Sequence, residues 1–501
     1  MLVVSVLFGG PLHAQTHKDT TLGFQIKPPK GYEGVAISPG DRISVAKFAS
    51  DSREHGPDGW IIPTFDVSFF SKGMLRDDQS EEDFVDNLWS NLENQVGYGE
   101  IEVDDLKVGR EKIVTKDFLP EDGRLSYFAA IYPMEDGYFQ FVGTTIADRY
   151  KKARSLYTKS VRSFKRIEVE VDEDRDAERA QMSTQERFLQ TQIEKLPNGW
   201  DYHRTERYLF LYNADKRFVE ELGEQIEAIR DVYEEIWVPT EPIEAISIVR
   251  VCGSRDDYYS YGGRPGTGGY WNSRERELVV FDNPPRDFCR AVLNHEAFHQ
   301  YIFYFYGQLS PASWYNEGTG DYFAGAKMTR TYRITKYDDA PGGIGRRETA
   351  KHACRLLQSG RTDDPNCATP LKDLLRYSQA EYYKRGGVHY AQGWAVVHFL
   401  REGKRLEPKW EAIYPDYLVN LVDARHEIAV EIMEEAIKDA EADEPGSSKD
   451  LSTDPEEWYG KASGSKTLEI QRLAYDKTFA TWSDEDWEDF NEAYLKYVEK
   501  L

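Results

Sequence analysis

The chain has 501 residues, of which 40% are hydrophobic and 30% charged, a composition typical of folded globular proteins and not of collagens, coiled coils or disordered chains. This length exceeds what one hydrophobic core organises, so we expect two or three domains. The net charge of -25 would repel phosphate backbones, which argues against nucleic acid as a partner.

The first 15 residues contain an apolar run, Leu2 to Phe8, that is followed by small residues near Ala14. This pattern is typical of a secretory signal peptide, here a remnant without its basic start. We therefore expect an exported protein, located in the periplasm, outside the cell or on its surface. The run is too short to span a bilayer, and no later stretch has the ~18 uncharged apolar residues of a membrane helix, so we expect no membrane-spanning segment.

Residues 16–167 are predicted to form an α+β domain. Short alternating apolar runs indicate strands at GFQIKPP, ISVAKF, IIPTFDVSFF, LSYFAAIYP and GYFQFVGTTIA, and helical patterns occupy residues 81–96 and 150–164. No cluster of catalytic type occurs here, which favours a binding, docking or folding role. Residues 168–198 are dense in charge and indicate a solvated linker or a connecting helix.

Residues 199–501 are predicted to form a second domain, and the chain as a whole belongs to the α+β class. The domain begins with a strand (TERYLFLYN), a long helix (219–236), a second strand (AISIVRV), a Gly-rich loop and a third strand (RELVVFD). Helical patterns then dominate to the C-terminus, apart from a polar insert, ADEPGSSKDLSTDPEE, that is expected to be a loop. This order predicts a small sheet packed on helices and a helical C-terminal part.

The helix predicted after Asp282-Asn283-Pro284, which supplies an N-cap and a first-turn proline, carries two histidines on its apolar face. That face consists of Phe288, Val292, His295, His299, Ile302 and Tyr306, at alternating spacings of four and three. A buried polar group without a partner costs about 1–3 kcal/mol, and a metal would satisfy both imidazoles. Glu296 lies between them, in an HExxH pattern, about 100° away round the helix, which leaves its carboxylate near a metal without binding it.

The next predicted helix, SWYNEGTGDYFAG, supplies a third ligand. Glu317 stands 18 positions after His299, and catalytic zinc takes three protein ligands with water in the fourth place. Asp321, one turn further, is placed to accept the second ring N–H of a liganding histidine. Gly318 and Gly320 suit a close approach to the first helix. The alternative is a pair of histidines satisfied within the core and two surface acids in a chain with 88 acidic residues.

HEAFH followed by WYNEGTGDYF resembles the gluzincin metallopeptidases of the peptidase MA superfamily, which include thermolysin and the alanyl aminopeptidases. Their pattern is HExxH followed by a Glu on the next helix, often within WxxEG, although the gap here is one residue shorter than in the aminopeptidases. The chain is more closely similar to a set of uncharacterised large bacterial secreted proteins with this motif pair. The resemblance covers residues 199–420 and implies a gluzincin-like domain with a small mixed sheet, a zinc helix and a helical C-terminal subdomain.

The resemblance further implies one zinc ion per chain, bound by His295, His299 and Glu317. Glu296 would be the general base and proton shuttle of a zinc-activated water, and Asp321 matches the acid that contacts a zinc-binding histidine in thermolysin-like members. The implied function is that of a zinc metallopeptidase, an enzyme that hydrolyses peptide bonds in a peptide or protein substrate. The alternative is a catalytically silent secreted binding or surface protein with a zinc-stabilised scaffold, which would have no need of Glu296.

Two further features follow from the same resemblance. Tyr390 in HYAQGW, with His389 beside it, is the candidate second donor to the oxyanion, although Tyr390 also fits a plain core stripe. The rim strand that pairs with extended substrate would be Gly269 to Trp271 or the following RELVVFD. No acidic GxMEN-like motif for a free α-amine occurs there, which favours an endopeptidase over an aminopeptidase.

The four cysteines, Cys252, Cys289, Cys354 and Cys367, have no CxxC spacing and do not indicate a structural zinc site. An oxidising compartment would permit two disulfides. The alternative is four buried thiols.

Overall fold

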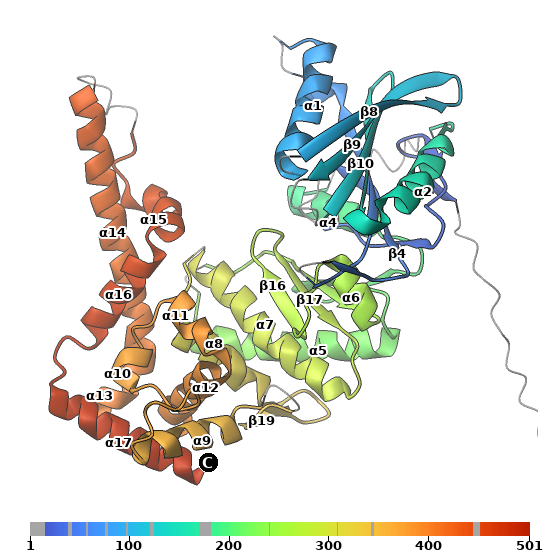
Figure 1. Ribbon diagram of the computed structural model, residues 1–501. Helices are drawn as coiled ribbons and strands as arrows, with labels where there is room; N and C mark the ends of the chain where they lie inside the picture. Colours follow the sequence, from blue (N-terminus) through green and yellow to red (C-terminus); the bar gives the residue numbers. More distant parts are fainter. Residues whose placement is uncertain are drawn as a thin grey trace, which may run out of the picture. The chain divides into compact units, whose positions relative to one another are not determined.

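The computed structural model describes residues 16–501 except 39–42, 57–58, 76–78, 97–98, 121–124, 170–181, 240, 308, 342–344 and 444–450. The predicted signal segment, residues 1–15, lies outside the described residues, so export stays a prediction. The chain divides into two compact units, one reaching to Tyr202 with residues 211–213 and 255–265, the other made of the remaining residues up to Leu501. Both units combine helices with sheets, which confirms the α+β class (Figure 1).

The first unit is built on a seven-stranded antiparallel sheet of order β3-β4-β7-β11-β10-β9-β8. Its strands are β3 (Tyr32–Gly34), β4 (Ser44–Ser50), β7 (Thr64–Ser71), β8 (Gly99–Val108), β9 (Glu111–Pro120), β10 (Leu125–Pro133) and β11 (Gly137–Ile146). Smaller strands are β1 (His17–Asp19), β2 (Phe24–Ile26) and β12 (Lys165–Arg166), which form a three-stranded sheet, and β5 (Glu54–Gly56) and β6 (Gly59–Ile61), which form a hairpin.

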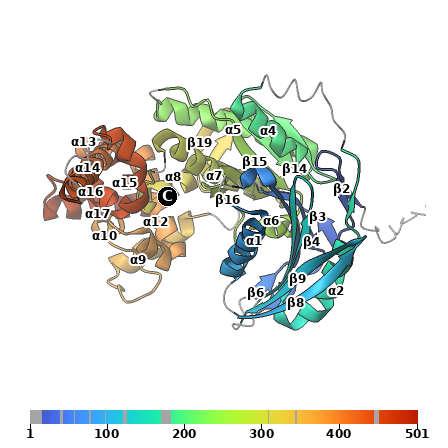
Figure 2. The same cartoon turned by 90° about the horizontal axis from the view of Figure 1, so that it is seen from above.

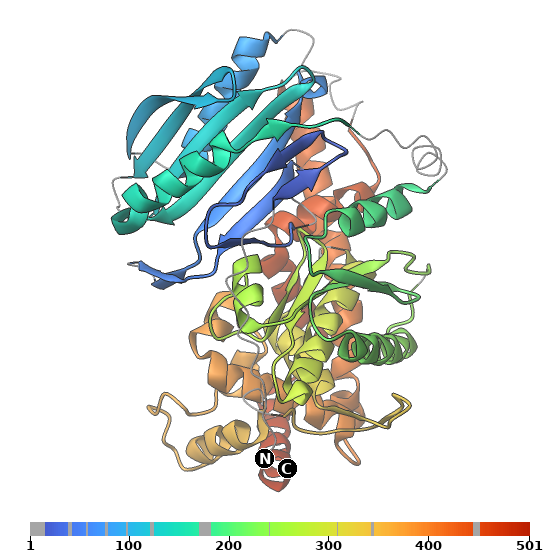
Figure 3. The same cartoon turned by 90° about the vertical axis from the view of Figure 1, so that its right-hand side faces the viewer.

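Two helices, α1 (Glu81–Val96) and α2 (Tyr150–Arg162), cover opposite faces of the large sheet (Figure 2). Side chains alternate across a strand, so neighbours on β10 enter different cores. Ala130 packs in one cluster with Tyr157 of α2, whereas Ala129 packs in another with Trp89 of α1. Figure 3 shows α2 lying across the sheet.

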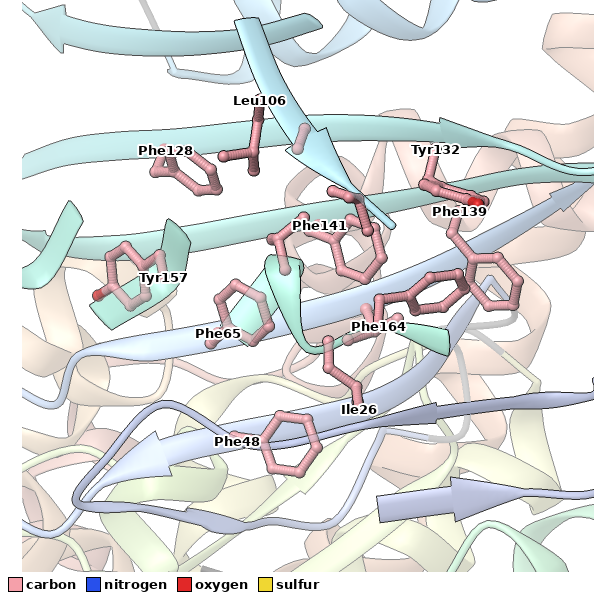
Figure 4. Packing of buried hydrophobic residues seen from close by; sticks show 14 of the residues in the cluster. Ile26, Phe48, Phe65, Leu106, Phe128, Tyr132, Phe139, Phe141, Tyr157 and Phe164 are labelled. Atoms are coloured by element: carbon pink, nitrogen blue, oxygen red, sulfur yellow. The ribbon is translucent and has the colours of Figure 1, made fainter. Parts of the chain in front are cut away.

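The core beneath α2 is rich in phenyl rings (Figure 4). The ring of Phe139 lies 5.1 Å from that of Phe164 and 4.8 Å from that of Phe24, centroid to centroid. Gly143 lets α2 come close, because a Cβ atom there would lie 2.4 Å from the Tyr157 ring. The core is mainly apolar, and the Tyr32 and Tyr157 hydroxyls within it hydrogen-bond to each other at 3.0 Å.

The five predicted strands and two predicted helices of this unit are confirmed, but β1, β3, β5, β6, β8, β9 and β12 were not predicted. Half of the residues of β8 are charged, and its buried apolar side chains, Leu106 and Val108, lie in its second half, so its apolar alternation is short. β8 pairs with β9 alone and forms the outer edge of the sheet. Within the predicted linker, the described part contains a helix, α4 (Thr184–Glu194), whose first turn is capped by the Ser183 hydroxyl.

A five-stranded mixed sheet of order β13-β14-β15-β17-β16 belongs mainly to the second unit. Its strands are β13 (Asp201–Arg204), β14 (Tyr208–Tyr212), β15 (Ser247–Cys252), β16 (Gly269–Asn272) and β17 (Glu277–Phe281). β15 runs parallel to β17, and β16 is antiparallel to β17 at the edge. The three predicted strands are β14, β15 and β17, which are wholly buried, and the predicted long helix is α5 (Lys216–Ile236).

The rest of this unit is mainly helical, as predicted. Its elements are α7 (Arg286–Tyr306), α8 (Ser313–Ala324), β18 (Ala326–Met328), β19 (Ile334–Tyr337), α9 (Arg347–Gln358), α10 (Leu371–Leu374), α11 (Gln379–Lys384), α12 (Gly386–Glu402), α13 (Pro408–Glu411), α14 (Ile413–Asp443), α15 (Tyr459–Ser465), α16 (Thr467–Thr478) and α17 (Asp484–Lys500). A short helix, α6 (Arg255–Tyr261), belongs to the residues grouped with the first unit. Of the predicted polar loop, residues 442–457, the segment 444–450 lies outside the described part of the chain, and residues 451–454 form neither helix nor strand, as predicted.

All four cysteines are buried and none forms a disulfide, so the alternative of four buried thiols is the one observed. Burial raises the pKa of the Cys289 thiol to about 12, which keeps it protonated at neutral pH. In the described part of the chain, no helix combines the length and the apolar character that crossing a bilayer requires.

Candidate metal centre

The site lies where two consecutive helices, α7 and α8, pack together, with α12 behind α8 (Figure 1). α7 begins at Arg286, after Pro285, and so starts later than the predicted N-cap at Asp282. It ends at Tyr306, and the next residue, Gly307, has a positive φ of 67°, which suits glycine. Ser313 is the first residue of α8. The two helices are therefore close neighbours along the chain.

The three predicted ligands gather at this junction. His295 Nε2 lies 3.0 Å from His299 Nε2, and Glu317 Oε2 lies 3.3 Å and 3.5 Å from these two nitrogens. In a tetrahedral zinc site with bonds of about 2.0–2.1 Å, neighbouring ligand atoms lie about 3.3 Å apart. The spacing therefore fits one zinc-sized ion, and over the described ranges no other group of three such side chains has this geometry.

Each imidazole is held through its other nitrogen. His295 Nδ1 lies 3.1 Å from Asp321 Oδ1, and His299 Nδ1 lies 3.1 Å from Asn316 Oδ1. Both oxygens accept a hydrogen bond, so Nδ1 carries the proton and Nε2 of each ring is turned toward the shared centre. Asp321 is held in turn by Arg346, whose Nε donates to Oδ2 at 2.7 Å.

The charges of the cluster stabilise each other. Burial lowers the pKa of His295, but the hydrogen bonds that the ring donates to Asp321 and Glu317 outweigh it and raise that pKa well above the ordinary value. Burial likewise lowers and Glu317 raises the pKa of His299, with a net increase. Burial raises the pKa of Glu317, but His299 and His295 outweigh it and hold that pKa well below its usual range. Without a metal, the site is a buried set of paired charges whose protons a divalent cation would replace.

Glu296 lies beside the ligand set without being part of it. Its Oε2 accepts a 2.9 Å hydrogen bond from the backbone N–H of Trp271 on β16. The charge of Glu296 also contributes to raising the pKa of both His295 and His299, which places it near them. A carboxylate in this position can exchange a proton with a group held at the metal.

The two glycines of α8 serve two different contacts. A Cβ atom on Gly320 would lie 2.9 Å from Cε1 of His295, so this position permits the close approach to α7 that was expected. A Cβ atom on Gly318 would lie 2.5 Å from the carbonyl oxygen of Gly393, so this position faces α12 instead. Only Gly320 therefore shapes the metal centre directly.

Tyr383 is a residue of the site that the sequence did not indicate. Its hydroxyl donates a 2.7 Å hydrogen bond to Glu317 Oε1. The predicted donor, Tyr390, stacks on Tyr383 with ring centroids 5.9 Å apart and planes 19° apart. Burial, the charge of Glu317 and the neighbouring Tyr383 raise the pKa of Tyr390, so its hydroxyl keeps its proton. Nothing local to Tyr383 distinguishes it among the 32 tyrosines of the chain.

His389 is not brought to the cluster. Its Nδ1 donates to the carbonyl oxygen of Tyr382 at 2.7 Å, and its Nε2 lies 3.1 Å from the Thr369 hydroxyl, in a buried position. Both ring nitrogens are thus engaged in holding α12 in place. The expectation that His389 could serve as a second donor is corrected accordingly.

No protein family matches the chain, and no curated protein matches it either. Similar solved structures include the solution structure of cyanobacterial PsbP (CyanoP) from Synechocystis sp. PCC 6803, with 15% identity, 32% of this chain and 98% of that chain covered, and a TM-score of 0.25. A crystal structure from Bacteroides thetaiotaomicron VPI-5482 has 9% identity, covers 58% of this chain and 80% of its own, and has a TM-score of 0.22. At these TM-scores neither similarity supports an inference about this chain.

Proposed function

We propose that the chain is a zinc-dependent metallopeptidase that hydrolyses peptide bonds, with an endopeptidase favoured over an aminopeptidase. The observation that carries the proposal is the convergence of His295 Nε2, His299 Nε2 and Glu317 Oε2 within 3.5 Å, with Glu296 adjacent but outside the set. Two imidazoles and a carboxylate are a donor set that catalytic zinc sites use, with water in the fourth place, and this supports the proposal.

His295, His299 and Glu317 would hold one zinc ion. When bound, zinc supplies a Lewis acid that lowers the pKa of a bound water to about 7. The protein's own groups supply the proton transfers. Because Oε2 of Glu296 accepts the Trp271 N–H, its Oε1 is the oxygen that takes the proton of the attacking water and passes it to the leaving amine. Tyr390, which keeps its proton, is the proposed second donor to the carbonyl oxygen.

The substrate backbone is proposed to pair with β16. β17 lies between β15 and β16, so both its edges are already paired, whereas β16 is the terminal strand of the sheet. Of the two predicted rim strands, Gly269–Asn272 is therefore the one with an edge for an extended peptide. Its link to Glu296 through Trp271 would align the scissile bond with the base.

The proposal is tested by zinc content and cleavage together. Purified protein should carry about one zinc per chain, and His295→Ala should lose it. Glu296→Gln should retain the zinc but reduce cleavage of an unfolded protein or a peptide library by on the order of 10²–10⁴-fold, because the general base is lost. Thermal unfolding of each variant checks that the fold is kept. Zinc-loaded wild type that cleaves nothing in a broad library would favour the catalytically silent binding protein instead.

A further inference from the structure

The two oxygens of the Glu317 carboxylate have different surroundings. Oε2 faces the imidazoles, at 3.3 Å from His295 Nε2 and 3.5 Å from His299 Nε2. Oε1 points the other way and accepts the 2.7 Å hydrogen bond from the Tyr383 hydroxyl. Glu317 is only 6% exposed, so little water can replace this donor. The two oxygens of the carboxylate are therefore engaged on opposite sides, Oε2 by the imidazoles and Oε1 by Tyr383.

The Tyr383 hydroxyl is oriented for this bond. It accepts a 3.3 Å hydrogen bond from Gln379 Nε2, one turn earlier on α11, which directs its own hydrogen toward Glu317. Stacking on Tyr390 and an edge contact with Tyr382, at 6.1 Å between centroids, fix the ring. Tyr383 is 42% exposed, so its position depends on these contacts and not on deep burial.

Building on the proposed zinc site, we infer that Tyr383 is a positioning residue that makes Glu317 a one-oxygen ligand. A carboxylate can bind a metal through one oxygen or through both. Binding through both would fill a further coordination position, which catalytic zinc reserves for water. The Tyr383 hydrogen bond keeps Oε1 away from the ion and thereby keeps that position open.

The test uses Tyr383→Phe in the full chain, loaded with zinc or with cobalt(II), whose visible absorption reports coordination number. The variant removes one oxygen atom from a ring that stays stacked. We expect weaker cobalt absorption than in wild type, as the carboxylate turns to bind through both oxygens, and zinc affinity changed by about tenfold. Tyr497→Phe is the matched control, because it removes a tyrosine hydroxyl that is hydrogen-bonded to His398 and not to a ligand of the site, and it should leave spectrum and affinity unchanged.

A second variant, Gln379→Met, removes the group that orients the Tyr383 hydroxyl and should shift the spectrum in the same direction by a smaller amount. Identical spectra and affinities in wild type, Tyr383→Phe and Tyr497→Phe would overturn the inference. Peptide cleavage is a separate readout: a wild type that binds zinc but cleaves nothing contradicts the proposed peptidase, while a spectral change in Tyr383→Phe that is absent from Tyr497→Phe would still support the positioning role.

Discussion

The phenyl core of the first unit and the metal centre of the second bury their side chains to a similar depth by opposite means. Phe65, Phe139 and Phe141 are fully buried and need only apolar neighbours, which stabilise them by about 25 cal/mol per Å² of buried area. Glu317 and Asp321 are 6% and 2% exposed and carry charge, which is costly to bury unless it is paired. In the aromatic core, the loss of stability caused by a substitution should therefore reflect the apolar contacts that are removed. In the metal centre, each charged side chain depends on its partner, so removing one group also disturbs the others.

The largest expected effect is a loss of stability in the aromatic core of the first unit that leaves the metal centre unchanged. Phe139→Ala should reduce the free energy of unfolding of the first unit by about 3–5 kcal/mol, because a fully buried ring leaves a cavity among neighbouring rings. Urea denaturation measures this, and zinc content should stay at the wild-type value. Val103→Ala, at a position 65% exposed, is the control and should change stability by less than about 0.5 kcal/mol. Loss of zinc from folded Phe139→Ala would contradict the separation of the two regions.

A smaller effect is expected from a substitution that disturbs the packing of α8 against α7 at the metal centre. Gly320→Ala places a Cβ atom 2.9 Å from His295, so either the imidazole or α8 must shift. Overpacking of this kind costs about 1–3 kcal/mol, and zinc affinity should fall with it. The control is Gly464→Ala on α15, where a Cβ atom meets nothing within 4 Å and a helical alanine should stabilise by up to about 1 kcal/mol. Calorimetry of both variants, with and without zinc, measures their stability. Equal changes in stability for Gly320→Ala and Gly464→Ala would contradict the close approach of α8 to His295.

Removing the charge of Asp321 from the metal centre should have a smaller effect, on zinc affinity. Asp321→Asn keeps an acceptor for His295 but leaves Arg346 without its carboxylate. We expect zinc affinity to fall about 10- to 100-fold, as for other groups that orient a metal-binding histidine. Asp338→Asn is the control, because Asp338 also pairs with an arginine but does not touch the ligands. A chelator competition assay that gives equal zinc affinities for the two variants would show that Asp321 does not support the site.

The mildest perturbation is pH. The pKa of His295 and of His299 is raised in the metal-free site, and zinc binds the neutral ring, so protons and zinc compete. Below the raised pKa values, zinc affinity should fall by about tenfold per pH unit for each proton released, and it should level off above them. Competition titrations from neutral to alkaline pH measure the slope. A flat profile across that range would mean that the histidines are already neutral without metal.

The metal centre was predictable where one helix or two consecutive helices decide the geometry. Spacing i, i+4 puts His295 and His299 on one face of α7, and Gly320 marks the contact of α8 with that face. Tyr383 and Arg346 come from segments further along the chain, and no local pattern links them to Glu317 or Asp321.

Adjacency along a helix also proved misleading. His389 was paired with Tyr390 because the two are neighbours, but successive residues of a helix point about 100° apart, and the two rings have different surroundings. In the first unit, β8 escaped prediction because its buried apolar side is limited to Leu106 and Val108, which is too short a pattern for strand prediction. Tertiary context, and not residue type, decides such positions.

The hydrogen bond from Trp271 to Glu296 has a mechanical consequence. A peptide that adds to β16 extends a sheet whose last strand is already tied to the carboxylate of α7, so any displacement of that strand on docking is transmitted to the base. Binding of a peptide along β16 and alignment of the Glu296 carboxylate would thereby be coupled. With a substrate too short to pair with β16, the Glu296 carboxylate would not be aligned with the scissile bond.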